Sequence, residues 1–148
     1  MNEMEKPLTK DDRAKFRELV TTYLKTMCVG DEEKFLEIWH PDARRFSIGN
    51  SNELHSFNLA EIVEYSLKGI KQLRKENPES CKIQHVLDEV LHLSIYNNLV
   101  AAVEVKWHMI LPDSKGLHHT YFHLARQNDK WLIVNVLDRG YELEKGDS

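Results

Sequence analysis

Apolar residues near the start of the chain recur with the spacing of a helix. The intervals between them are three, one, three, one and three positions, which places them on one face of a helix of about five turns. These residues are Phe16, Leu19, Val20, Tyr23, Leu24 and Met27. Gly30 follows this stripe and suits a helix end.

A second, shorter helix is expected directly afterwards. Asp31 is a favourable N-cap, and Pro41 cannot continue a helix. Between them, Phe35, Leu36 and Trp39 mark the expected buried side. Short strands over 44–48 and 53–57 should follow, joined by the turn 49–52. A third helix is expected from Asn58, which forms a capping pair with Glu61.

The pattern changes to strands in the second half of the chain. Four long strands are expected, over 83–95, 99–111, 117–127 and 131–140. Asn97-Asn98 and Asn128-Asp129 suit two-residue hairpin turns, because Asn tolerates positive φ. The prediction is an α+β fold, in which three N-terminal helices pack on a curved antiparallel sheet that forms a cone with one open mouth.

Pairing around the turns predicts which side chains share a face of the sheet. Asp88 is expected opposite Trp107, and Phe122 opposite Asn135. The face assigned to the concave side is apolar at its centre and polar towards one end. It carries Val86, Asp88, Val90, His92, Val103, Val105, Trp107, His118, Thr120, Phe122, Leu124, Ile133, Asn135, Leu137 and Arg139. A slip of one residue would invert this assignment.

The opposite face of the predicted sheet is also rich in apolar residues. Tyr121, Ala125, Leu132, Val134 and Val136 are too apolar for open solvent, so this face needs a cover. We expect the cover to be a second copy of the chain, giving a homodimer packed sheet against sheet.

Composition narrows the class of protein. With 148 residues, of which 41% are hydrophobic and 30% charged, the chain is expected to form one globular domain over 1–148, with frayed ends at 1–8 and 144–148. A net charge of −4 argues against nucleic-acid binding. No secretory signal or membrane-spanning run is visible, so we expect a cytoplasmic protein with reduced Cys28 and Cys81.

Several short motifs together resemble those of the nuclear transport factor 2-like superfamily. Tyr23 precedes Gly30-Asp31 by seven residues, and His40-Pro41-Asp42-Ala43 leads into the first strand. The end of the chain carries Leu124-Ala125-Arg126 and then Lys130-Trp131-Leu132-Ile133-Val134-Asn135. The resemblance extends from Phe16 to Tyr141 and is greatest to the SnoaL-like and lumazine-binding-type branch.

The resemblance implies a cone-shaped, cystatin-like roll, a homodimer and an apolar cavity between the helices and the sheet. It does not fix the function, because members include isomerases, dehydratases, cyclases and proteins that only bind. The ketosteroid isomerase pattern places its oxyanion-donor tyrosine at Tyr23 and its carboxylate base at Ser47. A serine without an activating partner cannot take a proton from carbon near neutral pH, which argues against the same isomerisation.

Tyr23, Asp88 and His92 are the candidate catalytic residues if the protein is an enzyme. Tyr23 could donate to a ligand or remain a core residue bonded to a backbone carbonyl. Asp88 could be a buried carboxylate with a raised pKa, or could pair with Arg139 or with a helix end near the rim. His92 and His118 could exchange protons near neutral pH or be structural.

The wider set of expected ligand-binding residues lines the concave side. It comprises Tyr23, Trp39, Phe57, Tyr65, Asp88, Trp107, Thr120 and Asn135. His119 and His123 share a strand face but lie about 13 Å apart, too far for one ion, so neither a metal nor another cofactor is expected. The favoured function is binding of a small apolar or aromatic ligand. The alternatives are an acid–base lyase, isomerase or cyclase, and a protein-interaction module without chemistry.

Overall fold

The computed structural model describes residues 10–76, 84–96, 99–111 and 114–144. The helices α1 (Lys10–Val29) and α2 (Glu32–Leu36) come first, followed by the strands β1 (Trp39–Ile48) and β2 (Leu54–Asn58). One continuous helical stretch follows, made of α3 (Leu59–Ile62), the π-helix η1 (Val63–Lys68) and α4 (Gly69–Glu76). Four long strands complete the chain: β3 (Gln84–Tyr96), β4 (Val100–Ile110), β5 (Ser114–Gln127) and β6 (Lys130–Glu144).

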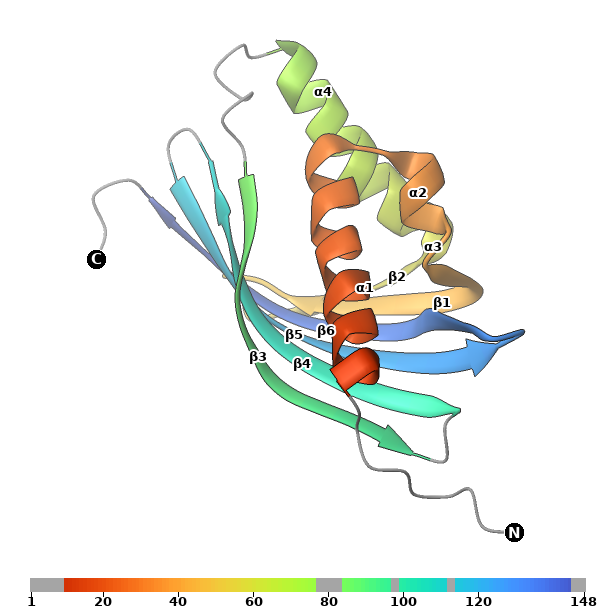
Figure 1. Ribbon diagram of the computed structural model, residues 1–148. Helices are drawn as coiled ribbons and strands as arrows, with labels where there is room; N and C mark the ends of the chain where they lie inside the picture. The colour runs from red at the N-terminus through yellow and green to blue at the C-terminus, as the bar shows by residue number, and fades with distance from the viewer. Residues whose placement is uncertain (1–9, 77–83, 97–98, 112–113, 145–148) are drawn as a thin grey trace, which may run out of the picture.

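The strands form one six-stranded sheet in the order β2-β1-β6-β5-β4-β3. Strand β1 runs parallel to β6, and the other neighbouring pairs are antiparallel. The long strands curve, and the helices lie on the concave side of the sheet (Figure 1). The mixed α+β architecture with a curved sheet therefore agrees with the sequence prediction.

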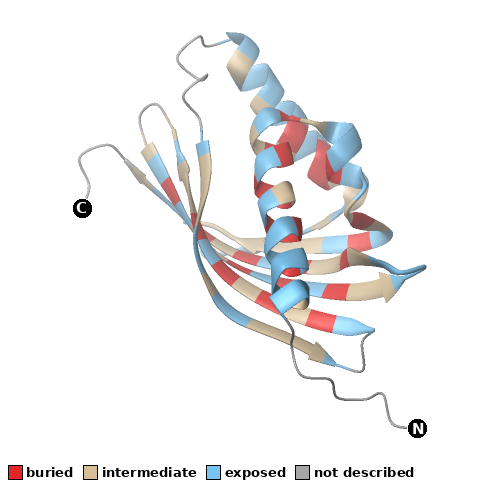
Figure 2. Cartoon of the chain, in the orientation of Figure 1, coloured by how far each residue is buried: buried red, intermediate tan, exposed pale blue. Residues whose placement is uncertain are grey.

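The core lies between α1 and the middle of the sheet. The stripe predicted on α1 is buried, with Phe16, Val20 and Tyr23 fully enclosed. Facing it are buried side chains from β4, β5 and β6, including Trp107 and Phe122. In Figure 2 the buried residues are found along α1 and on the strands that it crosses.

The helices depart from prediction at two points. Asp31 caps α2 by accepting from the backbone N–H of Lys34, as expected, but the helix ends at Leu36. Trp39 and Pro41 belong to β1, because β1 begins earlier than predicted and pairs Trp39 with Ile133 of β6. The capping box of Asn58 and Glu61 is present.

The expected count of three N-terminal helices is only partly matched. The helical stretch that follows Asn58 is interrupted by η1, in which Tyr65 and Ser66 lie. π-Helical turns inside α-helices are rare, and those that occur are often found at functional sites. Here it alters the direction in which Tyr65 and Ser66 point relative to a regular α-helix.

Three β-bulges change the predicted register. On β6 the pairing moves from Leu124↔Ile133 to His123↔Asn135, which leaves Val134 as an extra residue. On β3 the pairings Leu87↔Trp107 and Glu89↔Lys106 leave Asp88 as an extra residue, and Leu91 is a second. Each bulge reverses the side to which the following residues point.

The prediction placed six residues on the wrong face of the sheet. The outer face carries Val86, Asp88, His92, Asn135, Leu137 and Arg139, so the inference that placed them under the helices was wrong. For His92 the cause is the register next to the turn, where Ile95, and not Ser94, pairs with Ala101. Val136 and Leu93 turn inward instead, paired with Phe122 and Val103 respectively. The predicted pairing of β4 with β5 was also wrong, but it put no residue on the wrong face. The observed pair Trp107↔His118 differs from the predicted one by two residues, and a shift of two keeps each side chain on the same side.

The hairpin turn at Asn128-Asp129 is confirmed, with φ values of 53° and 61°. The turn predicted at Asn97-Asn98, residues 1–8 and Cys81 lie outside the described residues. Strand β6 extends to Glu144, into the segment expected to fray. In the described part of the chain, no helix is both long and apolar enough to cross a membrane.

Candidate active site

On the helix side of the sheet, a cavity of about 420 Å³ lies between β1, β6 and β5 and reaches several ionisable groups. Arg45, Ser47, His118, Asp138 and Glu142 are among the residues that line it. A second cavity of about 260 Å³ adjoins it beneath η1 and α4 and shares Arg45 and His118. Both cavities lie at the open end of the cone, whereas the part under α1 is filled by the core.

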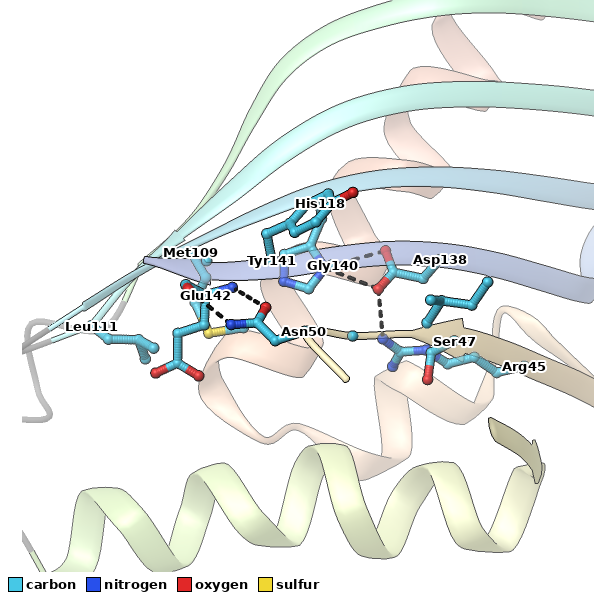
Figure 3. Close-up of a pocket in the computed structure, with 13 residues that line it drawn as sticks. Arg45, Ser47, Asn50, Met109, Leu111, His118, Asp138, Gly140, Tyr141 and Glu142 are labelled. Carbon is cyan, nitrogen blue, oxygen red and sulfur yellow. Dashed lines mark hydrogen bonds and ion pairs between the residues drawn. The ribbon is translucent and has the colours of Figure 1, made fainter. Parts of the chain in front are cut away.

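Asp138 is the centre of the polar group in this cavity. Its side chain is 3% exposed, and Nδ1 of His118 lies 2.9 Å from its Oδ2 (Figure 3). Nη2 of Arg45 lies 3.5 Å from the same oxygen, while Nη1 of Arg45 donates to Ser66 Oγ of η1 at 3.2 Å. The π-helix therefore helps to hold Arg45 beside the carboxylate.

Two buried side chains hold Asp138 from behind. Trp107 Nε1 donates to Thr120 Oγ1 at 2.9 Å, and the Thr120 hydroxyl donates to Asp138 Oδ1. Trp107 also stacks on His118, with ring centroids 4.0 Å apart and an interplanar angle of 9°. His118 is thus fixed on one ring face and at Nδ1, and its Nε2 has no hydrogen-bond partner among the described residues.

The electrostatic balance keeps Asp138 ionised. Burial by itself would raise the pKa of this carboxyl, but the hydrogen bond from His118 and the charge of Arg45 outweigh burial, and the net effect lowers the pKa. For Arg45, burial works to lower the pKa, while Tyr23 and Asp138 raise it. The result is a charged Arg45–Asp138 pair with a histidine attached to it.

Tyr23 lies behind this group rather than in the cavity. It is fully buried, its ring packs against Phe35, Trp39 and Phe122, and its hydroxyl has no hydrogen-bond partner among the described residues. Burial raises the pKa of its phenol, with Arg45 opposing that change. Tyr23 is a core residue whose hydroxyl is electrostatically coupled to the site.

The structure brings together only some of the residues predicted from the sequence. Trp107 and Tyr65 line the cavity beneath η1, and Phe57 lines a smaller one of about 180 Å³ beside β2. Thr120 is buried beneath the hydrogen-bonded pair of His118 and Asp138, called the dyad below, and Trp39 is a core residue.

Three predicted residues are far from this arrangement because they face outward. Asp88 is 44% exposed and bonds to Nδ1 of His108, not to Arg139. His92 is exposed and pairs with Glu104 in the ladder, and Asn135 contacts His123. None of them can act in the cavity.

Asp138 and Arg45 are the site residues that sequence reasoning missed. The predicted register would put Asp138 on the outer face, because the bulge at Val134 has no clear sequence signature. One signal was available: Asp138 directly follows the run 131–137, which is apolar except for Asn135, and it stands two residues before Gly140. His118 was considered as an acid–base group but not among the main candidates.

No group of three or more His, Cys, Asp or Glu side chains in the described residues is arranged to hold a metal ion. The side chains around the cavity can supply hydrogen bonds, the positive charge of Arg45 and an imidazole at His118 that can exchange a proton.

The sequence matches the family described as Putative lumazine-binding over residues 11–137. No curated protein matches the chain.

Three solved structures illustrate the likeness in fold. An NTF2-like protein of unknown function from Silicibacter pomeroyi DSS-3 has a TM-score of 0.67 at 16% identity, covering 90% of this chain and 99% of that one. An NTF2-like protein of unknown function from Shewanella baltica OS155 gives 0.66 at 12%, covering 91% and 98%. A domain with a cystatin-like fold from Nostoc punctiforme PCC 73102 gives 0.65 at 16%, covering 89% and 78%.

Proposed function

The chain belongs to the Putative lumazine-binding family of the NTF2-like superfamily, and from that premise we propose that it binds a small molecule at the open end of the cone, where His118 exchanges a proton with it. The observation that carries the proposal is the hydrogen bond between His118 Nδ1 and the buried, ionised Asp138 on a cavity wall. A carboxylate in this position orients an imidazole and stabilises its protonated form, as general bases require.

The neighbourhood of Ser47 supports acid–base chemistry in a form that the sequence did not reveal. Ser47 occupies the position at which isomerases of this superfamily carry their base. It pairs in the parallel ladder with Asp138 and lines the same cavity. The carboxylate therefore comes from β6 instead of β1, and it acts through His118.

The cavity also favours a small-molecule role over a pure interaction module. An interaction module needs no opening, and its cone can be filled by side chains. Here the part of the cone beneath α1 is filled, but the open end keeps a cavity within the size range of small-molecule sites.

A proton-exchange assay tests this function directly. A panel of ketones and 1,3-dicarbonyl compounds is incubated with the protein in D₂O, and loss of the exchangeable C–H signal is followed by NMR, alongside a thermal-shift screen for binding. We expect exchange that His118→Gln and Asp138→Asn abolish. His119→Gln is the matched control, because this adjacent histidine lies on the outer face and bonds to Glu104.

Two outcomes would count against the function. One is the absence of both binding and exchange across the panel. The other is exchange that His118→Gln and His119→Gln reduce equally, because the effect would then not depend on the cavity.

We also propose that the outer face of the sheet forms a homodimer interface. Tyr121 and Leu137 are each 39% exposed there, and Leu132 and Val134 are half-buried, with no covering element in the described part of the chain. The pairs Asp88–His108 and Glu104–His119 reduce the cost of covering charged groups on this face. Light scattering should give twice the chain mass, and Leu137→Glu should give the monomer; a monomeric wild type would contradict the interface.

A further inference from the structure

The cavity at the open end has two lobes of different character. The larger is the more polar of the two, with Arg45, Asp138, Glu142 and Asn50 among its walls. The smaller lies beneath η1 and α4, and apolar or aromatic side chains dominate its lining: Tyr65, Ile70, Leu73, Trp107, Met109 and Leu111. Four residues line both lobes, so the two environments meet there: Arg45, Met109, Leu111 and His118.

The direction of the hydrogen bonds fixes what His118 offers to the cavity. Trp107 Nε1–H can only donate, so the Thr120 oxygen accepts from it and the Thr120 hydrogen goes to Asp138. An ionised carboxylate can only accept, so His118 must carry its hydrogen on Nδ1 to make the bond at 2.9 Å. A neutral His118 therefore presents the lone pair of Nε2, which needs a donor.

Gly116 keeps this lone pair accessible. A β-carbon at that position would lie 3.3 Å from Nε2 of His118 and would cover it. Gly116 lies within β5 at a backbone conformation that other residues can adopt, so a turn does not explain the glycine.

The charges around the lobes disfavour an anion. Asp138 and Glu142 place two carboxylates on the polar lobe, and Arg45 is the one guanidinium among the described walls. Arg45 has little left to offer an anion, because Nη1 donates to Ser66, Nη2 pairs with Asp138, and Nε is buried without a partner among the described residues. A carboxylate head would meet two like charges and a cation that is already neutralised.

From these walls we infer the ligand class: an uncharged molecule with an apolar ring or short chain in the lobe beneath η1 and α4, and a hydroxyl that donates to Nε2 of His118. This inference rests on the proposed function, since it names what the same cavity binds. Tyr65 and Leu73 support it at the rim, where they are 67% and 39% exposed, as walls that an apolar ligand would cover.

Three probes with the same ring and chain separate the head groups. They are 4-propylphenol, which donates; 4-propylanisole, which cannot donate; and 4-propylbenzoate, which is an anion. Titration calorimetry at neutral pH should show the phenol binding about three- to tenfold more tightly than the anisole, the effect of one hydrogen bond. The benzoate should bind more weakly than either.

Two variants link this preference to His118. His118→Phe keeps a ring stacked on Trp107 but has no acceptor, so the phenol should lose its advantage while the anisole still binds. Gly116→Ala leaves His118 in place and covers Nε2, so it should lower phenol binding by a similar factor without changing anisole binding. Because Gly116→Ala removes no hydrogen bond of the dyad, it remains informative if His118→Phe does not fold.

The outcomes distinguish the ligand class from the function beneath it. Tightest binding by 4-propylbenzoate, or equal binding of phenol and anisole in the wild type, would overturn the ligand class. Such results would leave a small-molecule site in place, because binding would still occur. No binding by any probe up to its solubility limit would overturn the ligand class, while the proton-exchange assay decides the function independently.

Discussion

A β-carbon built on Gly140 would lie 2.8 Å from Cε1 and 2.9 Å from Nδ1 of His118. Real β-carbons do not approach other atoms so closely, so His118 occupies the space that any other residue at position 140 would fill. The lack of a side chain at position 140 of β6 therefore leaves the room that the His118 ring needs. Gly140 is two residues after Asp138, and both face the concave side.

Gly140→Ala should displace His118 and break its bond to Asp138. We expect a loss of about 1–3 kcal/mol in the free energy of unfolding, the usual cost of overpacking, together with loss of cavity binding. Urea denaturation and a ligand titration measure the two effects. Gly69→Ala is the control for stability: a β-carbon there meets nothing within 4 Å, and alanine in place of a helical glycine should stabilise by about 0.5–1 kcal/mol. It is not a control for binding, because Gly69 lines the cavity beneath η1 and α4. Unchanged stability in Gly140→Ala would contradict the contact.

Thr120→Val tests the link behind the dyad. The substitution leaves Trp107 Nε1–H buried without an acceptor and removes one donor from Asp138. The expected cost is about 1–3 kcal/mol, as for a buried polar group that loses its partner. Thr120→Ser retains the hydroxyl and should lose less. Denaturation midpoints that rank serine below valine would show that packing, not hydrogen bonding, dominates at this position.

Much of the fold was predictable because it follows local rules. The stripe on α1, the caps at Asp31 and Asn58 and the turn at Asn128-Asp129 each depend on neighbouring residues, and each is present. The concave positions of Trp107, Thr120 and Phe122 were also correct, because the mistaken pairing of β4 and β5 was off by an even number of residues.

The site was less predictable because a β-bulge depends on how a strand pairs with distant parts of the chain, and not on its neighbouring residues alone. Val134 is an extra residue in the pairing of β6 with β5. The pairing of β6 with β1 is irregular at the same place. An alternation of side chains read from the sequence cannot locate such a change. The predicted alternation therefore placed Asn135, instead of Val136, on the concave side. It also failed to place Asp138 there, although Asp138 is the centre of the polar group in the cavity.

Asp129→Gly should stabilise the protein. Both residues of the turn between β5 and β6 have positive φ, which costs energy for Asp and not for Gly. The gain should be below about 1 kcal/mol. The exposed Arg126–Asp129 contact that is lost contributes little, so its loss should not cancel this gain. Thermal unfolding measures it. Asp129→Val should destabilise instead, because a β-branched residue is strained at positive φ; if both variants destabilise, the turn geometry is wrong.

His85 should make stability fall between neutral and mildly acidic pH. Burial lowers its pKa to about 4, although Nδ1 bonds the carbonyl of Leu24, and its Nε2 is buried without a partner among the described residues. A histidine in the unfolded chain has a pKa of about 6.5. As the pH falls from 6.5 to 4, the unfolded state takes up a proton that the folded state resists, so stability present above 6.5 is progressively lost, by up to about 3 kcal/mol. Urea denaturation at several pH values should show this slope in the wild type and a flatter one in His85→Gln. An equal slope in the two proteins would mean that His85 is not the group responsible.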